Sequence, residues 1–400
     1  MTPPTRFASL RRAGGFSIVE LMVSVVIGML ALVFAVRMVA GSEKSRATEL
    51  GGSDSMQNGM VALFSISGDA NQAGFGLNDP LLSGCNTQFS DTGGYGLAPG
   101  ASTGTTPLAP VVIESNGSAP DRISFYAGSS LAGTATLRLS SSYGGGTRVS
   151  VDRVPFGFSR GDVVVVAPEV AGAGRCALAQ LSSNPRDLLP PPGPQYVDVA
   201  YGTSYRFNTG ALGVNFTGGA ARIFNMGRPD DLSFHTWSVA GGFLQLRSTD
   251  LSGSSAAAAA VTDNIVSIKA QYGFDTRTGA AFQPQTGMQV MRWSSTMIDA
   301  DGNGTIGNAV DYQHVAAVRL AVVARSKAVE RVAAGATCTS TPEKPQVFKV
   351  ATPQNVTAVP VTVDVAVAGD PNQWQCYRYR VFETVVNLRN AGWRPEAWNK

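Results

Sequence analysis

The chain has 400 residues, which is enough for one large domain or two medium-sized domains. Charged side chains make up only 15% of it and glycine occurs 45 times, a composition typical of a β-rich exported protein with many turns. Three of its 31 basic residues are Arg6, Arg11 and Arg12, and without them 28 basic side chains balance 28 acidic ones. Because no block of basic residues is present, the sequence argues against binding of nucleic acid through its phosphates.

The first predicted element is an apolar helix that begins at Phe16 and reaches about Ala40. At 1.5 Å per residue this stretch spans roughly 37 Å, enough to cross a lipid bilayer. In an ordinary secretory signal the cleavage site follows the apolar core, whereas here Gly14 and Gly15 precede it. Cleavage at this point would therefore leave the helix on the mature protein. The arginines of segment 1–15 indicate that this leader stays cytoplasmic and that the chain after Gly41 faces the periplasm.

Glu20 is the one carboxylate in this apolar helix, which we predict as a membrane segment of residues 16–40. A charged group inside a membrane costs several kcal/mol unless it is paired, so Glu20 is a candidate functional residue. The alternative is that its side chain, one turn into the helix, reaches the lipid headgroups without a protein partner.

We expect the helix to continue as an amphipathic segment over residues 41–72. Apolar residues recur there at intervals of three and four, which gives the helix one face to place on a sheet: Met56, Met60, Val61, Leu63 and Phe64. Gly51 and Gly52 weaken it by roughly 1 kcal/mol each and would permit a bend. The glycine-containing segment 68–76 predicts the end of the helix, near Ser67.

Most of the remaining chain predicts strands, since apolar and polar residues alternate in short runs. The predicted strands are 111–113, 122–126, 134–139, 148–152, 162–167, 176–181, 221–226, 232–239, 243–247, 264–274, 315–324, 359–367 and 377–388. Segment 184–194 is proline-rich and predicts an extended connector, whereas segment 252–260 is either a linker or a short helix. A boundary near residue 255 would divide the β-rich region into lobes 73–255 and 256–400. The predicted fold class is α+β: a long N-terminal helix packed on a large antiparallel β-rich region.

Four cysteines follow the membrane segment: Cys85, Cys176, Cys338 and Cys376. In an oxidising periplasm an even number indicates disulfides, with three possible connectivities. We favour Cys338–Cys376, which would link parts of the C-terminal lobe, and Cys85–Cys176 by elimination. The alternative is free buried thiols. A zinc site is not expected, because the chain has no CxxC pair and only two histidines.

The run from Gly14 to Glu20, Gly-Gly-Phe-Ser-Ile-Val-Glu, resembles the N-terminus of type IV prepilins and pseudopilins. The resemblance implies that a prepilin peptidase cleaves between Gly15 and Phe16 and methylates the new Phe16 amine. It also implies that Glu20 pairs with the Phe16 amine of a neighbouring subunit and sets the axial register of a filament. On this resemblance the protein is a filament subunit and not an enzyme.

Further segments resemble the PilW-type minor pilins: 68–76 followed by Cys85, 161–166 followed by Cys176, 263–275, and 379–390, which ends in Leu-Arg-Asn. The resemblance implies a minor pilin that joins other minor pilins and the major pilin at the inner membrane. It would prime assembly or sit at the tip, because a subunit this bulky packs badly along a shaft. The alternatives are a J-type minor pseudopilin of type II secretion and a tip-associated adhesin. A membrane-anchored hydrolase rests only on unassigned Ser, Asp and His residues.

One segment has the spacing of a calcium loop, with oxygen side chains at positions one, three and five, glycine at six and a backbone carbonyl at seven. The residues are Asp299, Asp301, Asn303, Gly304 and Thr305. At position twelve, where an EF-hand has glutamate, this chain has Val310. Asp311, one place later, is the candidate to replace that glutamate as a ligand. PilW-like proteins often carry an Asp-x-Asp-Gly loop near this place. The two interpretations are a structural calcium clamp and a hairpin turn without an ion.

Other candidates for a catalytic or binding site have weaker support in the sequence. The chain lacks the G-x-S-x-G, P-loop, HExxH and dinucleotide-binding motifs. His235 lies in the predicted strand 232–239, where a cross-strand surface role is favoured over catalysis.

Overall fold

The computed structural model describes residues 17–128, 136–184, 195–199, 205–207, 211–330, 332 and 336–392. Internal contacts group the chain into two units, Met1–Ser53 and Asp54–Lys400. The leader, with the predicted cleavage position at Gly15 and Phe16, lies outside the described residues, as does the predicted connector from residue 185 to 194.

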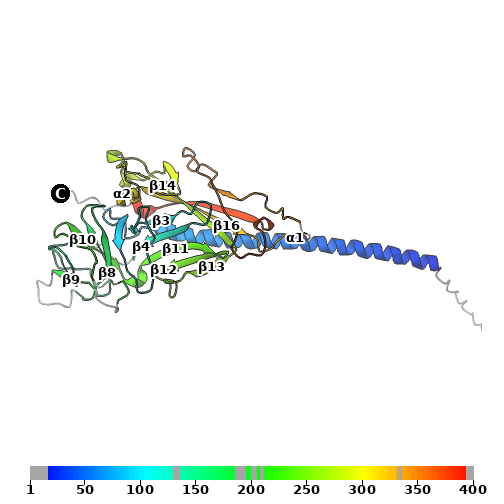
Figure 1. The fold of residues 1–400 in the computed structure, drawn as a ribbon, viewed down its shortest axis with the longest axis horizontal. Coiled ribbons are helices and arrows are strands. Elements are labelled where there is room, and N and C mark those ends of the chain that lie inside the picture. The colour runs from blue at the N-terminus through cyan, green and yellow to red at the C-terminus, as the bar shows by residue number, and fades with distance from the viewer. Residues whose placement is uncertain are drawn as a thin grey trace, which may run out of the picture. The chain divides into compact units, whose positions relative to one another are not determined.

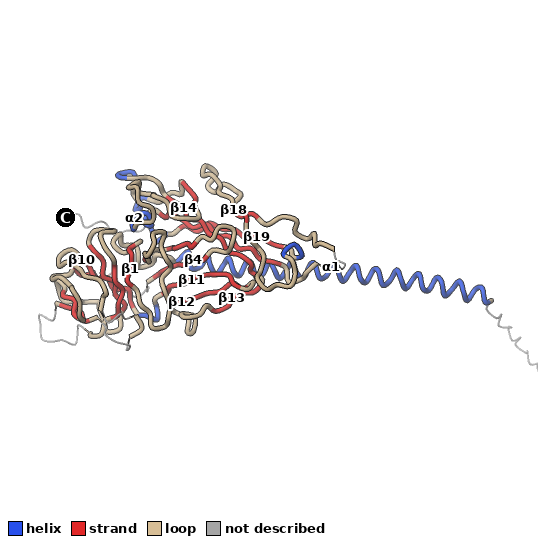
Figure 2. The backbone as a smooth tube through the Cα atoms, in the orientation of Figure 1, coloured by secondary structure: helices blue, strands red, loops and turns tan. Residues whose placement is uncertain are grey.

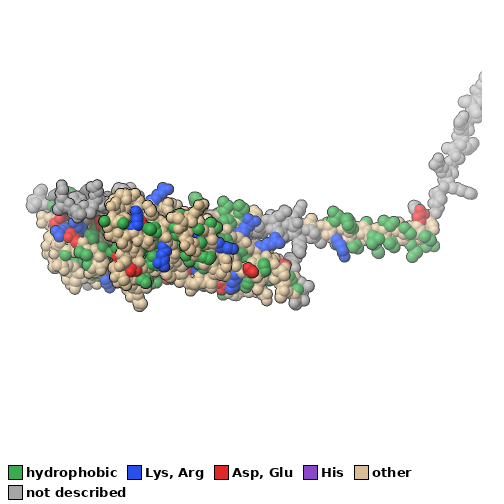
Figure 3. Space-filling model, turned by 90° about the horizontal axis from the view of Figure 1, so that it is seen from above, with side chains coloured by type: hydrophobic (Ala, Val, Ile, Leu, Met, Phe, Trp, Pro, Cys, Tyr) green, Lys and Arg blue, Asp and Glu red, His purple; other side chains and the backbone are tan. Residues whose placement is uncertain are grey.

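Helix α1 (Ile18–Gln72) is one continuous helix of 55 residues that contributes to both units (Figure 1). In the first unit its residues Ile18–Val39 are long and apolar enough to cross a membrane, and apolar side chains cover this part of the helix (Figure 3). In the second unit one face of the helix enters the main hydrophobic core through Ala62, Ile66 and Ala70, and Ala73 directly after the helix continues this face. The spacing of four, four and three residues places these side chains on a single face.

The helix ends later than the glycine-containing segment 68–76 predicted. Gly68 lies inside the helix, where no atom comes within 4 Å of the position that a Cβ would take. The chain leaves the helix at Gly74, which has a φ of +80° and donates its N–H to the Tyr126 carbonyl at 2.8 Å. A single glycine costs a helix only about 1 kcal/mol. The burial of Ala70 beyond Gly68 outweighs that cost, so the helix passes the predicted end near Ser67. It ends at Gln72, the last residue of the predicted amphipathic segment 41–72.

The β-rich region contains three larger sheets (Figure 2). The first has the order β2 (Pro107–Leu108), β1 (Cys85–Gln88), β8 (Cys176–Gln180), β7 (Val163–Pro168), β10 (Ala221–Gly227) and β5 (Thr136–Arg138). Strands β1 and β8 are parallel and the other pairs are antiparallel. Both faces of this sheet are buried: Val163 and Val165 join the main core, whereas Val164 and Val166 join a second one. Burial on both faces explains the uninterrupted valine run of β7.

The other two large sheets are antiparallel. One has the order β13 (Ala259–Asp263), β12 (Phe243–Ser248), β11 (Ser233–Ala240), β4 (Arg122–Ala127) and β3 (Val111–Glu114). The other has the order β15 (Arg292–Ser294), β14 (Ile265–Phe274), β16 (Val315–Arg325) and β19 (Tyr379–Asn387). Strands β14 and β16 are its central strands and are buried along almost their whole length, in register from Ile265 opposite Ala324 to Phe274 opposite Val315. The main core combines side chains of both sheets with the buried face of α1.

Smaller elements complete the fold. Two ribbons pair β6 (Arg148–Ser150) with β9 (Tyr196–Asp198) and β17 (Gln346–Val347) with β18 (Val361–Thr362). The short helices are α2 (Ala309–Gln313), α3 (Arg389–Gly392) and the 3₁₀ turns η2 (Pro229–Asp231), η3 (Gly279–Ala281), η4 (Pro284–Thr286) and η5 (Trp374–Cys376). The α+β class expected from the sequence is therefore observed.

Two local predictions differ from the structure. Segment 252–260 is neither a linker nor a helix: a turn is followed by β13, in which Ala259 and Ala260 pair with Leu246 and Gln245. The free edge of β12 supplies hydrogen bonds that overrule the helix preference of alanine. This pairing carries one sheet across residue 255, where a lobe boundary was suggested. The predicted strand 359–367 is reduced to β18, although Val363 and Val365 further along are buried.

Candidate functional site

Glu20 lies in the first turn of α1, and its side chain is exposed among exposed apolar neighbours such as Val19 and Leu21. Within the described part of the chain it makes no ion pair. A carboxylate on an otherwise apolar helix of membrane-spanning length requires a cationic partner or access to the headgroups. Its proposed partner, the Phe16 amine, lies outside the described residues.

A second exposed apolar surface lies on α1 in the other unit. Met56, Met60, Val61 and Phe64 are 47%, 54%, 47% and 80% exposed, and we call these four residues the outer face of α1. They point away from the face that Ala62 and Ile66 bury in the core. A cluster of large exposed apolar side chains on a folded domain marks an interaction surface.

The buried end of α1 is tied to strand β11 through a carboxylate. Asp69 Oδ2 accepts a hydrogen bond from Trp237 Nε1 at 2.6 Å and lies 2.7 Å from His235 Nδ1. On the other side of the imidazole ring, His235 Nε2 lies 2.8 Å from Asp250 Oδ1. Burial by itself lowers the pKa of His235, but the hydrogen bonds and charges of Asp250 and Asp69 outweigh it and raise the pKa to about 9. At neutral pH the ring is therefore a cation held between two carboxylates.

This arrangement bears on the hydrolase alternative. Ser233 Oγ lies 3.1 Å from His235 Nε2, so serine, histidine and aspartate are close together. A general base must present an unprotonated ring nitrogen to the serine hydroxyl. His235 has both nitrogens engaged by carboxylates and a pKa of about 9, so it is a poor base for Ser233. His235 joins α1 to β11, a contact that the predicted cross-strand role did not include.

The candidate calcium loop brings its acidic residues together. Asp299, Asp301 and Asp311 each place one carboxylate oxygen within 4.8 Å of the others. Asp299 accepts hydrogen bonds from the backbone N–H groups of Gly304 and Gly302, both at 2.8 Å. These hydrogen bonds, led by that from Gly304, lower the pKa of Asp299 and keep it ionised at neutral pH. Gly304 itself has a φ of +89°, which explains glycine at position six.

The other loop positions have distinct environments. Asn303 Oδ1 accepts from the backbone N–H of Thr305 at 2.8 Å, and the Thr305 carbonyl accepts from the Asn308 side chain at 2.9 Å. Asp311 is fully buried at the start of α2, where it accepts backbone N–H groups of Ala300 at 2.7 Å and Gly307 at 2.8 Å. Burial raises the pKa of Asp311 despite these bonds. The donor set consists of oxygens and fits a hard cation. Asp299 and Asp301 would be its main ligands, because Asp311 already closes the loop.

Both disulfides favoured by the sequence form in the structure. Cys85 in β1 is bonded to Cys176 in β8, with the two Cα atoms 6.0 Å apart. Cys338 is bonded to Cys376 in η5, with the two Cα atoms 4.8 Å apart. The first bond joins the parallel neighbours β1 and β8, and the second holds segment 336–341 next to the start of β19.

One buried ionic site was missed by the sequence analysis. Lys269, in the central strand β14, and Asp121 have side chains 1% and 0% exposed and form an ion pair. Lys269 Nζ also donates to the carbonyls of Gly117 at 2.8 Å and Ala119 at 3.0 Å. Burial raises the pKa of Asp121 and outweighs the hydrogen bond and charge of Lys269. The sequence feature that could have revealed this site is Lys269 itself, a charged residue in the middle of the predicted strand 264–274.

Comparison with known families gives one match. Residues 238–390 match the family model described as Type IV Pilus-assembly protein W. The matched span begins in β11 and ends in α3, and it contains the loop 299–311 and the two C-terminal motifs at 263–275 and 379–390. Comparison with curated proteins and with solved structures gives no match. Residues 238–390 are therefore similar to this family, which relates this part of the chain to type IV pilus assembly.

Proposed function

We propose that the protein is a minor pilin of the type IV pilus, with a structural and not an enzymatic role. The observation that carries the proposal is the composition of α1 along its length. Its first part is a bare apolar helix of membrane-spanning length, and its last part is built into the core of a β-rich region that includes the PilW-family match. A helix that serves both as membrane anchor and as domain core suits a subunit that leaves the membrane to enter a filament.

Processing at the N-terminus is the first part of the proposal. A prepilin peptidase cleaves between Gly15 and Phe16, and Phe16 becomes the methylated first residue of a protein anchored once in the inner membrane. The region from residue 54 onward then lies in the periplasm. Mass spectrometry of the purified mature protein tests this, and a chain that still begins at Met1 or begins after residue 40 would contradict it.

Glu20 then pairs with the Phe16 amine of a neighbouring pilin during assembly. Glu20→Ala removes the carboxylate from an exposed position, so we expect normal accumulation in the membrane but loss of the protein from sheared filaments. Ser24→Ala on the same helix is the matched control, since among the described residues the Ser24 hydroxyl bonds only to a carbonyl of its own helix. Quantitative immunoblots of membrane and filament fractions measure the result. Equal incorporation of both variants would show that Glu20 has no role in assembly.

The outer face of α1 packs against the helices of neighbouring subunits in this proposal. Phe64→Glu places a charge on a residue that is 80% exposed, so folding should be retained while incorporation is lost. Phe156→Glu is the matched control, because Phe156 is 73% exposed in a loop of the β-rich region. Incorporation of both variants at the unmodified level would exclude the outer face from assembly.

We infer the position of the protein in the filament from the size of its second unit. The second unit comprises residues 54–400, whereas the helical segment it surrounds ends at Gln72. Such a bulky subunit is accommodated at an end more easily than along a shaft, so we place it at the tip or in a priming complex with other minor pilins and the major pilin. Immunogold labelling along whole filaments would overturn this placement. Deletion should abolish piliation and leave type II secretion intact; the reverse result would assign the chain to the pseudopilins.

We also propose that loop 299–311 holds a structural calcium ion. The support is the convergence of Asp299 and Asp301 on one side of a turn whose backbone is already set by Gly302 and Gly304. The ion would stiffen the connection between β15 and β16 and would take no part in a reaction.

A further inference from the structure

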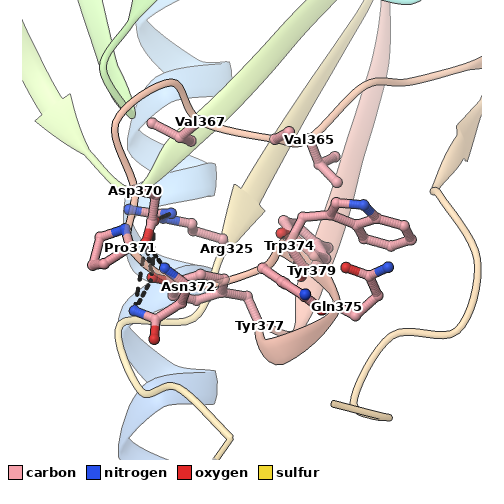
Figure 4. Close-up of a pocket in the computed structure, with 12 residues that line it drawn as sticks. Arg325, Val365, Val367, Asp370, Pro371, Asn372, Trp374, Gln375, Tyr377 and Tyr379 are labelled. Carbon is pink, nitrogen blue, oxygen red and sulfur yellow. Dashed lines mark hydrogen bonds and ion pairs between the residues drawn. The ribbon is translucent and has the colours of Figure 1, made fainter. Parts of the chain in front are cut away.

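A cavity of about 490 Å³ opens beside the start of β19 (Figure 4). Arg325 at the end of β16 and Tyr379 at the start of β19 contribute to it, together with Trp374 and Gln375 of η5 and the segment from Val365 to Asn372. Its volume lies within the range of ordinary ligand sites. Its exposed lining is more polar than apolar, and three aromatic side chains contribute to it.

The walls of the cavity are held in place by internal bonds. Arg325 forms an ion pair with Asp370, and its guanidinium carbon lies 4.4 Å from the centre of the Tyr377 ring. The Tyr377 hydroxyl donates to Asp370 Oδ2 at 2.8 Å, and the Tyr379 hydroxyl donates to the Trp374 carbonyl at 2.8 Å. The disulfide between Cys376 and Cys338 holds η5 in place. The site is therefore preformed, which reduces the ordering cost of binding.

Other polar groups of the cavity remain available to a ligand. Among the described residues, neither the indole nitrogen of Trp374 nor the side-chain amide of Gln375 has a hydrogen-bond partner, and both side chains are half-buried. In Figure 4 the Trp374 ring and the Gln375 amide lie on the opposite side of the cavity from the bonded group of Arg325, Asp370 and Tyr377.

The charged side chains that line the cavity indicate which class of ligand it can bind. Arg325 and Asp370 neutralise each other, so the lining has no net charge to attract an anion. A cation would need an open carboxylate, but Asp370 is already engaged by Arg325, by Tyr377 and by the backbone N–H of Asn372 at 2.9 Å. What remains is a set of aromatic surfaces and amide-type donors and acceptors. Pyranose rings match this set, because their C–H faces pack on aromatic rings and their hydroxyls bond to amides.

We propose that this cavity binds a neutral saccharide. The inference does not depend on the assignment as a minor pilin, since it uses only the side chains of the cavity. It adds a recognition function to a domain that would otherwise be purely structural.

The test uses the full-length mature protein in a polyoxyethylene detergent, because sugar-based detergents would compete. The probes are the methyl glycosides of glucose, galactose, mannose and N-acetylglucosamine, with N-acetylneuraminic acid as the anionic and choline as the cationic comparison. Saturation-transfer NMR with titration measures binding. We expect at least one neutral glycoside to bind, and the two charged probes to show no transfer.

Two variants of cavity residues test whether the glycosides bind in this cavity. Gln375→Ala removes a side chain without an internal partner, and Trp374→Phe keeps a ring but removes the indole N–H. Each should weaken binding about tenfold, which corresponds to about 1.4 kcal/mol. Gln354→Ala, in an exposed loop outside the lining, is the control and should leave affinity unchanged. If Trp374→Phe unfolds, Gln375→Ala decides alone. The proposal is overturned if none of the four glycosides binds, if only a charged probe binds, or if Gln375→Ala binds as tightly as the control.

Discussion

Gly59 of α1 lies directly against the aromatic ring of Phe382 in β19. A Cβ atom built at Gly59 would lie 2.1 Å from Phe382 Cε2, far inside the 3.5–4.0 Å at which carbon atoms normally pack. The absence of a side chain at residue 59 therefore sets how closely the helix approaches the four-stranded sheet. This contact joins a residue near the start of the second unit to a strand within the PilW-family match.

The first prediction concerns this contact. Gly59→Ala should lower the thermal unfolding temperature, because overpacking costs about 1–3 kcal/mol and exceeds the gain of about 1 kcal/mol in helix propensity. Gly68→Ala is the matched control in the same helix, where a Cβ meets nothing within 4 Å, and it should be neutral or stabilising. Circular dichroism melts of the detergent-solubilised protein measure both. Equal stabilisation by the two alanines would show that the Phe382 ring moves aside at no cost.

The second prediction is a pH dependence from His235. Its pKa is about 9 in the folded protein, above its ordinary value of 6.5, so the folded state binds the proton more tightly. The resulting stabilisation is complete below pH 6.5 and is lost as the pH rises from 6.5 through 9. A shift of this size corresponds to about 3 kcal/mol. Denaturant unfolding between pH 6 and 10 should show this loss.

The control for the histidine prediction is His235→Gln. Glutamine keeps a polar side chain but does not titrate, so this variant should be less stable than the parent at pH 6 and should lose less stability towards pH 10. Asp250, whose pKa is lowered by its bond to His235 although burial alone would raise it, remains ionised through this range. Parallel pH profiles of the two proteins would exclude His235 as the source.

The third prediction concerns the buried pair Lys269 and Asp121. Lys269→Met leaves the Asp121 carboxylate buried without its cation and should destabilise the protein by about 3–5 kcal/mol. The double variant Lys269→Met, Asp121→Asn removes the uncompensated charge, so it should recover part of this loss. Unfolding free energies of the four proteins give the coupling between the two side chains. Additive effects would mean that the pair contributes no interaction of its own.

The fourth prediction tests the metal loop. Calcium at millimolar concentration should release or absorb heat in calorimetric titration and raise the unfolding temperature, and a chelator should reverse the effect. Asp299→Ala should abolish the response, whereas Asp230→Ala, at an exposed acid outside the loop, should preserve it. No heat with the parent protein, or an unchanged response in Asp299→Ala, would leave the loop as an ordinary turn.

Local patterns in the sequence were sufficient to predict several features of the fold. The apolar run after Phe16 predicted the first part of α1. Short runs that either alternate or are continuously apolar predicted β4, β7, β11, β14 and β16 within one or two residues. These patterns are local because side-chain direction repeats every 3.6 residues in a helix and every two in a strand. The even number of cysteines predicted disulfides, and their placement favoured the observed pairing among three possible connectivities.

Contacts between distant residues were decided only by the tertiary structure. Ala259 and Ala260 form a strand because β12 offers them a free edge, and their composition alone does not show this. His235 meets Asp69, and Lys269 meets Asp121, across separations of 166 and 148 residues. Nothing in either local sequence specifies the partner, because hydrogen bonding and charge neutralisation depend on which groups folding buries together.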